Sequence, residues 1–351
     1  MARPRPAPAA EVGLAKLLLF PEKLASLPLN GPAGRDLSYP VSVELSLTND
    51  CNQDCRWCSD RALRRRAGER LDLGALQRLF DDLAGGGVRG VTIEGGGEPT
   101  VSPVFEAATV AALERGLALG LITNGLDLFP AGRDPDIYGK FEWIRVSLDA
   151  AGRRPYRELK GVDGFDRVLA NLGRLAESSP GATLGVGYVL TSRNDDVDEL
   201  GALARILRDL GVDYLHIRPV VDHPELTSRQ SLEELKQLET PDFAVNLAAL
   251  ADNEVRGNDG LPCLAHSLSA VIGAAGEVWL CGRLNIESSA RPIGHLAATG
   301  FKDIWAGPER ARQTALAAQP AFCLAHCPQC RMTKYNRLLA DMSRLKTRNF
   351  I

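Results

Sequence analysis

Residues 40–58 read PVSVELSLTNDCNQDCRWC, an apolar, β-branched run followed directly by three closely spaced cysteines. The run at 41–48 has the composition of a buried strand. Cys51, Cys55 and Cys58 therefore lie on a loop that leaves a strand, with the spacing C-x3-C-x2-C. This grouping of three of the chain's eight cysteines predicts a metal or redox site rather than structural disulfides.

Strand patterns alternate with helix patterns from about residue 40 to residue 222. Further strands are predicted at 90–95, 117–125, 143–149, 183–191 and 214–220. Helical spacing of apolar residues occurs at 71–85, 103–116, 164–178 and 197–211, and two polar helices are expected at 231–239 and 241–255. This alternation predicts βαβ units and a parallel sheet. Because no Rossmann glycine fingerprint follows the first strand, we expect an α/β fold, a partial (β/α)6 TIM-like barrel.

The unusual residues follow the carboxyl ends of the predicted strands. The cysteine loop follows the first strand, GGGEP (95–99) the second, TNG (123–125) the third, and SLD (147–149) closes the fourth. In a parallel barrel these ends share one face, where active sites are built. The sequence therefore predicts that the four segments converge.

Composition limits the class of protein and its partners. The 351-residue chain has 45% hydrophobic residues and a formal net charge of −3, so it shows no electrostatic footprint for nucleic acid. No run of about 18 apolar residues predicts a membrane span. Glu11 and Lys16 interrupt the apolar N-terminal stretch, which argues against a signal peptide. We expect a cytoplasmic protein with reduced cysteines.

Three thiolates can hold three irons of a [4Fe-4S] cubane and leave the fourth iron open. The alternative, a zinc site, needs a fourth cysteine or histidine, and the histidine nearest in sequence is His216. The combination of CNQDCRWC with GGGEP about forty residues later resembles the radical S-adenosylmethionine (radical SAM) superfamily. The resemblance implies that the open iron chelates the amino and carboxylate groups of SAM, and Trp57 matches the aromatic residue usual before the third cysteine.

The resemblance also implies roles for residues of the other loops. Gly95, Gly96, Gly97 and Glu98 would bind the methionine end of SAM, where missing side chains give access to backbone carbonyls. Asn124, Ser147 and Asp149 match positions that contact SAM or substrate, although each alone could simply cap a strand. Arg218, at the end of the sixth strand, is a candidate substrate contact for a carboxylate or hydroxyl group, with a surface ion pair as the alternative.

The five remaining cysteines lie near the C-terminus, at positions 263, 281, 323, 327 and 330. Their pattern, with PIGHL and FKDIW between the two groups, resembles the SPASM/Twitch auxiliary-cluster extension. A full SPASM extension uses seven cysteines, so the single-cluster Twitch version is expected. Its [4Fe-4S] ligands would be Cys263, Cys281, Cys327 and Cys330.

Cys323 is left over, and its interpretation stays open. It could replace Cys327 or Cys330 as a ligand, be a structural thiol, or donate a hydrogen atom during catalysis. A zinc site with His326 as an extra ligand is a further alternative. The expected domains are an N-terminal extension (1–40), the barrel (41–254), the auxiliary-cluster domain (255–335) and a C-terminal helix or tail (336–351).

The family's chemistry implies two [4Fe-4S] clusters, SAM, and an external electron donor of flavodoxin or ferredoxin type. Reductive cleavage of SAM would give a 5′-deoxyadenosyl radical that abstracts a hydrogen atom from substrate. The residues before the first strand are too few for the leader-binding domain of many peptide-modifying relatives, so we expect a small substrate resembling a sugar or aminocyclitol, with epimerisation favoured. The alternatives are dehydrogenation of the same substrate class, a peptide maturase, and a non-catalytic iron–sulfur electron carrier.

Overall fold

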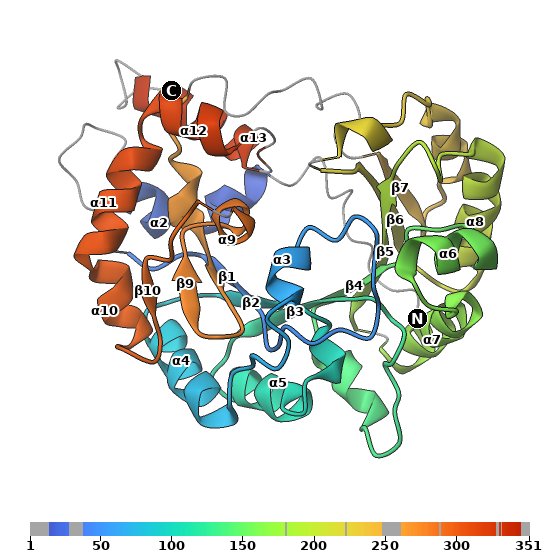
Figure 1. The fold of residues 1–351 in the computed structure, drawn as a ribbon, viewed down its shortest axis with the longest axis horizontal. Coiled ribbons are helices and arrows are strands. Elements are labelled where there is room, and N and C mark those ends of the chain that lie inside the picture. The colour runs from blue at the N-terminus through green and yellow to red at the C-terminus, as the bar shows by residue number, and fades with distance from the viewer. Residues whose placement is uncertain are drawn as a thin grey trace.

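The computed structural model describes residues 14–27, 38–179, 181–221, 223–247, 261–287, 289–327, 330 and 332–344, with the side chains of Pro320 and Cys323 left aside. Within these residues one ten-stranded sheet has the order β10-β9-β8-β1-β2-β3-β4-β5-β6-β7. The strands follow an arc from β10 at the left of Figure 1 to β7 at the right. This is the α/β architecture with a parallel sheet that the sequence predicts.

All six predicted strands are confirmed. They are β1 (Ser42–Leu45), β2 (Gly90–Ile93), β3 (Ala118–Thr123), β4 (Trp143–Ser147), β5 (Thr183–Leu190) and β6 (Tyr214–Pro219). Each pairs in parallel with the next, so their carboxyl ends lie at one edge. The loops that carry the cysteines, the glycines, Asn124 and Asp149 all leave this edge.

The parallel sheet continues beyond six strands on both sides. β7 (Ala244–Leu247) pairs in parallel with β6, although a helix was expected over 241–255, so that prediction is wrong for residues 244–247. The short apolar run fits a strand as well as a helix turn, and periodicity alone cannot separate the two. On the other side β8 (Ser269–Ile272) pairs in parallel with β1.

Helices cover the outer face of the sheet. The four predicted amphipathic helices are confirmed as α4 (Leu73–Gly85), α5 (Phe105–Leu113), α7 (Phe165–Ser178) and α8 (Val197–Asp209). Asp72 and Asp196 cap α4 and α8 by accepting hydrogen bonds from the amides of Ala75 (2.8 Å) and Glu199 (2.9 Å), a type of contact worth about 1 kcal/mol each. Leu76 and Phe80 of α4 are completely buried.

The two faces of the strands differ in character. On β4 and β6 the residues that face the helices, such as Ile144 and Ile217, are fully buried. The alternate residues, which include Arg145 and His216, are only partly buried. The inner, concave face of this part of the sheet is therefore polar rather than a packed apolar core.

The C-terminal region is attached to the barrel by the sheet and by packing. Antiparallel strands β9 (Glu277–Trp279) and β10 (Gly294–His295) extend β8, followed by α10 (Phe301–Ala306), α11 (Pro308–Ala317), α12 (Pro320–His326) and α13 (Thr333–Arg344). The rings of Phe301 and Tyr39 pack edge to face at 5.4 Å. The predicted domain boundary at 254/255 lies outside the described residues.

None of the helices in the described part of the chain is long and apolar enough to cross a membrane.

Candidate active site

The cysteine loop between β1 and the short helix α3 (Arg61–Arg64) is held from behind by helix α6 (Arg153–Lys160). The amides of Asp54 and Arg56 donate to the carbonyls of Lys160 (2.9 Å) and Leu159 (3.0 Å), at the end of α6. Gln53 donates to the hydroxyl of Tyr156 at 2.7 Å. The backbone that carries Cys51, Cys55 and Cys58 is therefore fixed by a helix 100 residues further along the chain, which the sequence analysis missed.

Two arginines of α3 bind the same loop from the solvent side. The guanidinium of Arg61 donates to the carbonyl of Cys55 at 2.5 Å, and that of Arg64 donates to the carbonyl of Gln53. Burial raises the pKa of all three thiols, to about 11 for Cys58 despite an opposing hydrogen bond from Arg64. Binding of metal would release these protons, as thiolate ligation requires.

The glycine loop after β2 packs directly on the cysteine loop. The amides of Gly97 and Glu98 donate to the carbonyls of Thr48 (2.9 Å) and Asp50 (2.8 Å). A Cβ on Gly97 would lie 1.9 Å from the carbonyl oxygen of Asp50, and one on Gly96, where φ is +52°, would lie 2.3 Å from Asn49. Glycine is thus required here for the close approach of two backbones, whatever ligand the loop also binds.

Glu98 joins the loops after β2 and β3. Its carboxylate accepts hydrogen bonds from the Thr100 amide (3.1 Å) and hydroxyl (2.8 Å), the Thr123 hydroxyl (2.6 Å) and the Asn124 amide (2.7 Å). Burial raises the pKa of Glu98, and the donated bonds oppose that shift. Glu98 is only 3% exposed, and its carboxylate holds the loops after β2 and β3 in position. A direct contact with SAM stays a prediction.

Asn124 is brought next to the cysteine loop. Its Nδ2 donates to Oδ1 of Asn52 at 2.7 Å and lies 4.0 Å from the sulfur of Cys51. Its amide is the one that Glu98 binds. The predicted convergence of the cysteine, glycine and TNG segments is therefore confirmed at the level of side-chain contacts.

Asp149 forms a buried ion pair with Lys160 at 2.5 Å, and both residues are at most 5% exposed. Its other carboxylate oxygen accepts the amide of Val189 at 2.7 Å. Asp149 also has a positive φ of 58°, a strained conformation for a residue other than glycine. Burial alone would lower the pKa of Lys160, but the charge of Asp149 and the nearby Cys55 raise it above its ordinary value.

Lys160 was missed by the sequence analysis, because nothing in YRELKG distinguishes it from a surface lysine. Its ammonium group nevertheless lies near Cys55, whose pKa it lowers against the dominant effect of burial.

The structure also locates the other residues that the sequence predicted for the site. Trp57 is 9% exposed in the core, Ser147 lies on the concave face, and Arg218 is exposed at the end of β6.

Hydrogen bonds join the segments that carry the C-terminal cysteines. Asn336 of α13 accepts the amides of Leu264 (2.8 Å) and Ala265 (2.7 Å), and its Nδ2 lies 3.9 Å from the sulfur of Cys263. Arg283, two residues after Cys281, donates to the carbonyl of His326 at 2.9 Å, next to Cys327. The side chain of Cys323 lies outside the described residues, so its predicted roles stay predictions.

The arrangement of the cysteines can be compared with what a zinc site and an iron–sulfur cubane each require. Among the described residues no three Cys, His, Asp or Glu side chains converge on one point as ligands of a single ion. A tetrahedral zinc site needs Zn–S distances of about 2.3 Å and so brings its sulfurs together. A cubane takes one cysteine per iron, which leaves the sulfurs further apart. Three cysteines on one fixed loop, in no disulfide, fit the cubane better than zinc.

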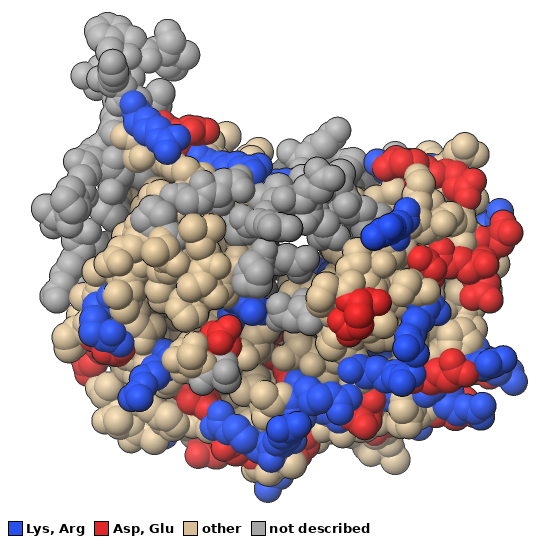
Figure 2. All heavy atoms as spheres, turned by 45° about the horizontal axis from the view of Figure 1, so that its top comes forward, with Lys and Arg blue, Asp and Glu red and all other residues tan. Residues whose placement is uncertain are grey.

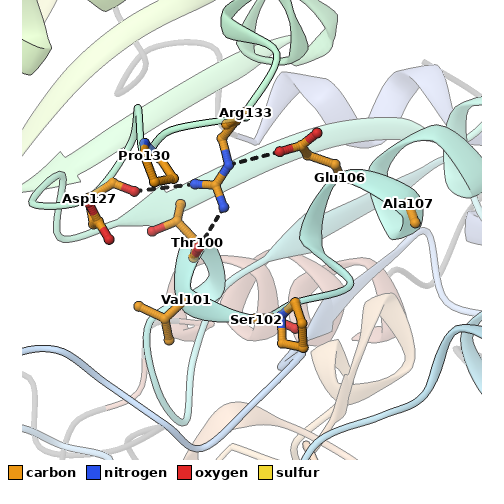
Figure 3. Close-up of a pocket in the computed structure, with 9 residues that line it drawn as sticks. Thr100, Val101, Ser102, Glu106, Ala107, Asp127, Pro130 and Arg133 are labelled. Atoms are coloured by element: carbon orange, nitrogen blue, oxygen red, sulfur yellow. Dashed lines mark hydrogen bonds and ion pairs between the residues drawn. The ribbon is translucent and has the colours of Figure 1, made fainter.

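A pocket of about 500 Å³ lies behind the Glu98 segment and is not the predicted site (Figure 3). Arg133 lines it and donates to the carbonyls of Thr100 (2.8 Å) and Asp127 (3.2 Å) and to Glu106 (3.1 Å). The guanidinium thus ties the loop after β3 to the turn after Glu98. We therefore assign Arg133 a structural role, which is to hold these two segments together.

Exposed arginines surround the cysteine loop. Figure 2 shows Lys and Arg side chains in a band across the lower part of the molecule, with acidic side chains among them. Beside the loop, Arg61 pairs with Asp54 (3.3 Å), and Arg66 pairs with Glu69 (2.8 Å). In the described part of the chain no ion pair involves Arg56, Arg65, Arg70 or Arg157. The face next to the cysteines is therefore locally basic although the chain is not.

Comparisons with known proteins agree with this geometry. The radical SAM superfamily model matches residues 45–204, and the SPASM iron–sulfur cluster-binding domain model matches residues 263–331. Mycofactocin maturase MftC of Mycobacterium tuberculosis is 25% identical over 312 residues, covering 85% of this chain and 78% of MftC. PqqA peptide cyclase of Ruegeria pomeroyi is 26% identical over 234 residues, 66% of this chain and 61% of the cyclase.

Among solved structures, Streptococcus suis SuiB bound to precursor peptide SuiA has a TM-score of 0.64 at 17% identity, covering 92% of this chain and 76% of SuiB. These relatives do not show the predicted likeness to sugar and aminocyclitol enzymes. The predicted SPASM/Twitch-type extension is matched by the SPASM model, and its single auxiliary cluster, as in the Twitch version, stays a prediction. The chain belongs to the radical SAM superfamily, as a radical SAM enzyme with a C-terminal SPASM iron–sulfur domain.

Proposed function

We propose that this enzyme is a peptide maturase, which removes hydrogen from a peptide substrate to form a crosslink or another oxidised product. The observation that carries the proposal is the relationship to a maturase along 85% of the chain and to a peptide cyclase along 66% of it. The fold shared with a protein that holds a precursor peptide agrees with it. The sugar or aminocyclitol substrate expected from the sequence becomes the competing outcome.

The proposed cofactors are SAM, a [4Fe-4S] cluster on Cys51, Cys55 and Cys58, and at least one auxiliary cluster on the C-terminal cysteines. When bound, they supply the electron and the hydrogen-atom abstraction. The protein's own part is to hold the cysteine loop through α6, to fix the glycine loop through Glu98, and to place Asn124 beside Cys51. These contacts keep the segments around the reacting centre in one arrangement.

The test is activity of the anaerobically reconstituted enzyme with SAM and dithionite. Candidate substrates are peptides translated from short reading frames next to its gene, compared with a panel of sugars and aminocyclitols. We expect 5′-deoxyadenosine formation to rise with one peptide, whose mass then falls by two hydrogen atoms for each crosslink. Turnover of a sugar, with no peptide giving either response, would replace this proposal by the small-molecule alternative.

We further propose that the exposed arginines beside the cysteine loop receive an acidic electron donor, such as a flavodoxin or ferredoxin. Arg61 reaches the carbonyl of Cys55, so this surface adjoins the loop that would hold the reducible cluster. Complementary charge raises association rates by 10-fold or more at low ionic strength. The absence of ion pairs at Arg56, Arg65 and Arg157 among the described residues leaves their charge available to a partner.

Changing Arg56, Arg65 and Arg157 together to glutamine should slow flavodoxin-driven SAM cleavage about 10-fold at low salt, while dithionite-driven cleavage stays unchanged. The matched control changes three exposed arginines around α8, Arg193, Arg205 and Arg229, to glutamine. The measurement is the rate of 5′-deoxyadenosine formation against flavodoxin concentration at several salt concentrations. If both triple variants slow flavodoxin-driven SAM cleavage equally, the arginines beside the cysteine loop do not bind the electron donor.

A further inference from the structure

Helix α13 carries a polar side chain on its buried face. The buried residues of this helix have the spacing of a single helical face and are Thr333, Asn336, Leu339 and Ala340. Leu339 belongs to the same apolar cluster as Ala265, and Asn336 is completely buried. A buried carboxamide needs hydrogen-bond partners for its oxygen and for its nitrogen, because an unmet polar group in the interior is costly. The partners of Asn336 therefore indicate what this residue does.

The orientation of the Asn336 side chain is fixed by two backbone amides. Its Oδ1 accepts the amides of Leu264 at 2.8 Å and Ala265 at 2.7 Å. Backbone amides only donate hydrogen bonds, so the atom that they share must be the oxygen of the carboxamide and not its nitrogen. The nitrogen, Nδ2, consequently faces the other way and lies 3.9 Å from Sγ of Cys263. The fold thus directs a hydrogen-bond donor at this sulfur.

The same helix holds two of the cysteines that are predicted to ligate the auxiliary cluster. At its N-terminal end the amide and the hydroxyl of Thr333 donate to the carbonyl of Cys330, at 3.2 Å and 2.7 Å. About one turn later Asn336 reaches Cys263, whose own amide donates to the carbonyl of Ala317 at 3.1 Å. Neither cysteine is in a disulfide, so both sulfurs fit the role of cluster ligands. Helix α13 therefore joins two ligand segments that lie far apart in the sequence.

The loop that would hold the SAM-binding cluster has a contact of the same type. Nδ2 of Asn124 lies 4.0 Å from the sulfur of Cys51, while its Oδ1 accepts the amide of Leu126 at 2.9 Å. In both places an asparagine oxygen accepts a backbone amide and the nitrogen faces the sulfur of a predicted ligand. Hydrogen bonds to the sulfurs help to set the reduction potential of an iron–sulfur cluster. A donor stabilises the thiolate, and it does so more strongly once reduction has added negative charge.

We propose that Asn336 is a positioning residue of the auxiliary cluster, whose Nδ2 donates a hydrogen bond to the thiolate of Cys263 and raises the reduction potential of that cluster. Its oxygen holds the two amides that follow Cys263, so the donor and the sulfur keep one arrangement. The inference rests on the auxiliary cluster of the proposed function and not on the identity of the substrate. A higher potential makes the cluster easier to reduce, which suits an enzyme that removes hydrogen from its substrate.

The test is a redox titration of the reconstituted full-length enzyme, followed by EPR. SAM alters the signal of the cluster whose open iron it chelates, so the signal that SAM leaves unchanged belongs to the auxiliary cluster. Asn336→Leu removes the donor without adding charge, and Asn336→Asp keeps an acceptor oxygen for the two amides. We expect the equilibrium constant for reduction of the auxiliary cluster to fall about threefold in Asn336→Leu and about tenfold in Asn336→Asp, the latter equal to about 59 mV for one electron.

The matched control is Asn285→Asp, which adds the same charge on the short helix α9 (Gly282–Ile286), just after Cys281. The side chain of Asn285 is half-buried and makes no hydrogen bond among the described residues. It should change the reduction equilibrium less than about twofold, because solvent screens its charge. Equal falls in Asn285→Asp and Asn336→Asp would assign the effect to charge alone and overturn the proposal. An unchanged potential in Asn336→Leu with full iron content would overturn it as well.

A second measurement does not depend on whether the Asn336 variants retain iron. The wild-type enzyme is labelled with ¹⁵N in its asparagine side chains, and pulsed EPR is recorded on the reduced auxiliary cluster. A hydrogen bond from Nδ2 of Asn336 to the Cys263 thiolate should give a resolved coupling to ¹⁵N in the signal that SAM leaves unchanged. The absence of this coupling would overturn the proposal.

The proposed ligands and the role of Asn336 can fail separately. Cys263→Ala should lose the auxiliary iron, and if it keeps that iron, Cys263 is not a ligand and the proposed set of ligands fails. Loss of iron in Cys263→Ala together with an unchanged potential in Asn336→Leu would keep the auxiliary cluster and remove only the role of Asn336. Neither measurement needs an identified peptide, so the maturase proposal is tested apart from both.

Discussion

Cys55→Ala is expected to abolish reductive cleavage of SAM. Cys55 lies in the middle of the loop that α6 fixes, and a cubane left with two of its three protein ligands is poorly retained. Iron and sulfide content, together with 5′-deoxyadenosine formed with dithionite, measure the result. Cys51→Ala and Cys58→Ala should behave in the same way, while the C-terminal cysteines keep their share of the iron.

The matched control for this experiment is Ser59→Ala, an exposed neighbour on the same loop whose hydroxyl donates to Asp60 at 3.3 Å and makes no other hydrogen bond among the described residues. It should retain the full iron content and the full rate of cleavage. If Cys55→Ala still cleaves SAM at the rate of Ser59→Ala, this loop does not hold the cluster, and the assignment of all three ligands fails.

The second large effect is expected for Lys160→Met, which should lower the free energy of unfolding by about 3–5 kcal/mol. The change leaves the buried carboxylate of Asp149 without its cation, in a conformation whose positive φ is already strained. The carbonyl of Lys160 also accepts the amide of Asp54, so disturbance of the helix end should loosen the cysteine loop. Urea unfolding of the wild type and the variant measures the cost.

Lys140→Met is the control, because Lys140 is an exposed lysine at the end of a short helix. It should change the free energy of unfolding by less than about 0.5 kcal/mol. Adding Asp149→Asn to Lys160→Met should recover part of the loss, since the buried charge is then removed as well. A loss below about 1 kcal/mol in Lys160→Met would mean that the ion pair is not the element that holds this region.

The parts of the fold that could be predicted are those with a local signal. The strands at 90–93 and 143–147 and the helix at 73–85 carry their periodicity within one segment. Helix α6 was not predicted, because in RRPYRELK only Tyr156 and Leu159 are apolar and buried, too few for a recognisable stripe. The strand at 244–247 was read as helix, since its burial depends on pairing with β6.

The same division applies to the candidate site. The convergence of Cys51, Gly97 and Asn124 follows from a rule about parallel strands and could be predicted. The tasks of Glu98 and Lys160 could not, because they depend on contacts with Thr123 and Asp149 that only the folded chain brings within reach. The four hydrogen bonds that Glu98 accepts within the protein could not be read from the sequence, and its predicted contact with SAM stays a prediction.

The parallel pairing of β1 with β8 has a consequence for engineering this enzyme. Strand β1 leads into the cysteine loop, and β8 covers the side of β1 that β2 leaves open. A truncated barrel that ends before β8 would expose the backbone of that strand as a new edge, a template for aggregation. Chimeras that exchange C-terminal regions between relatives should therefore keep β8 from the same parent as β1 and place the junction after it.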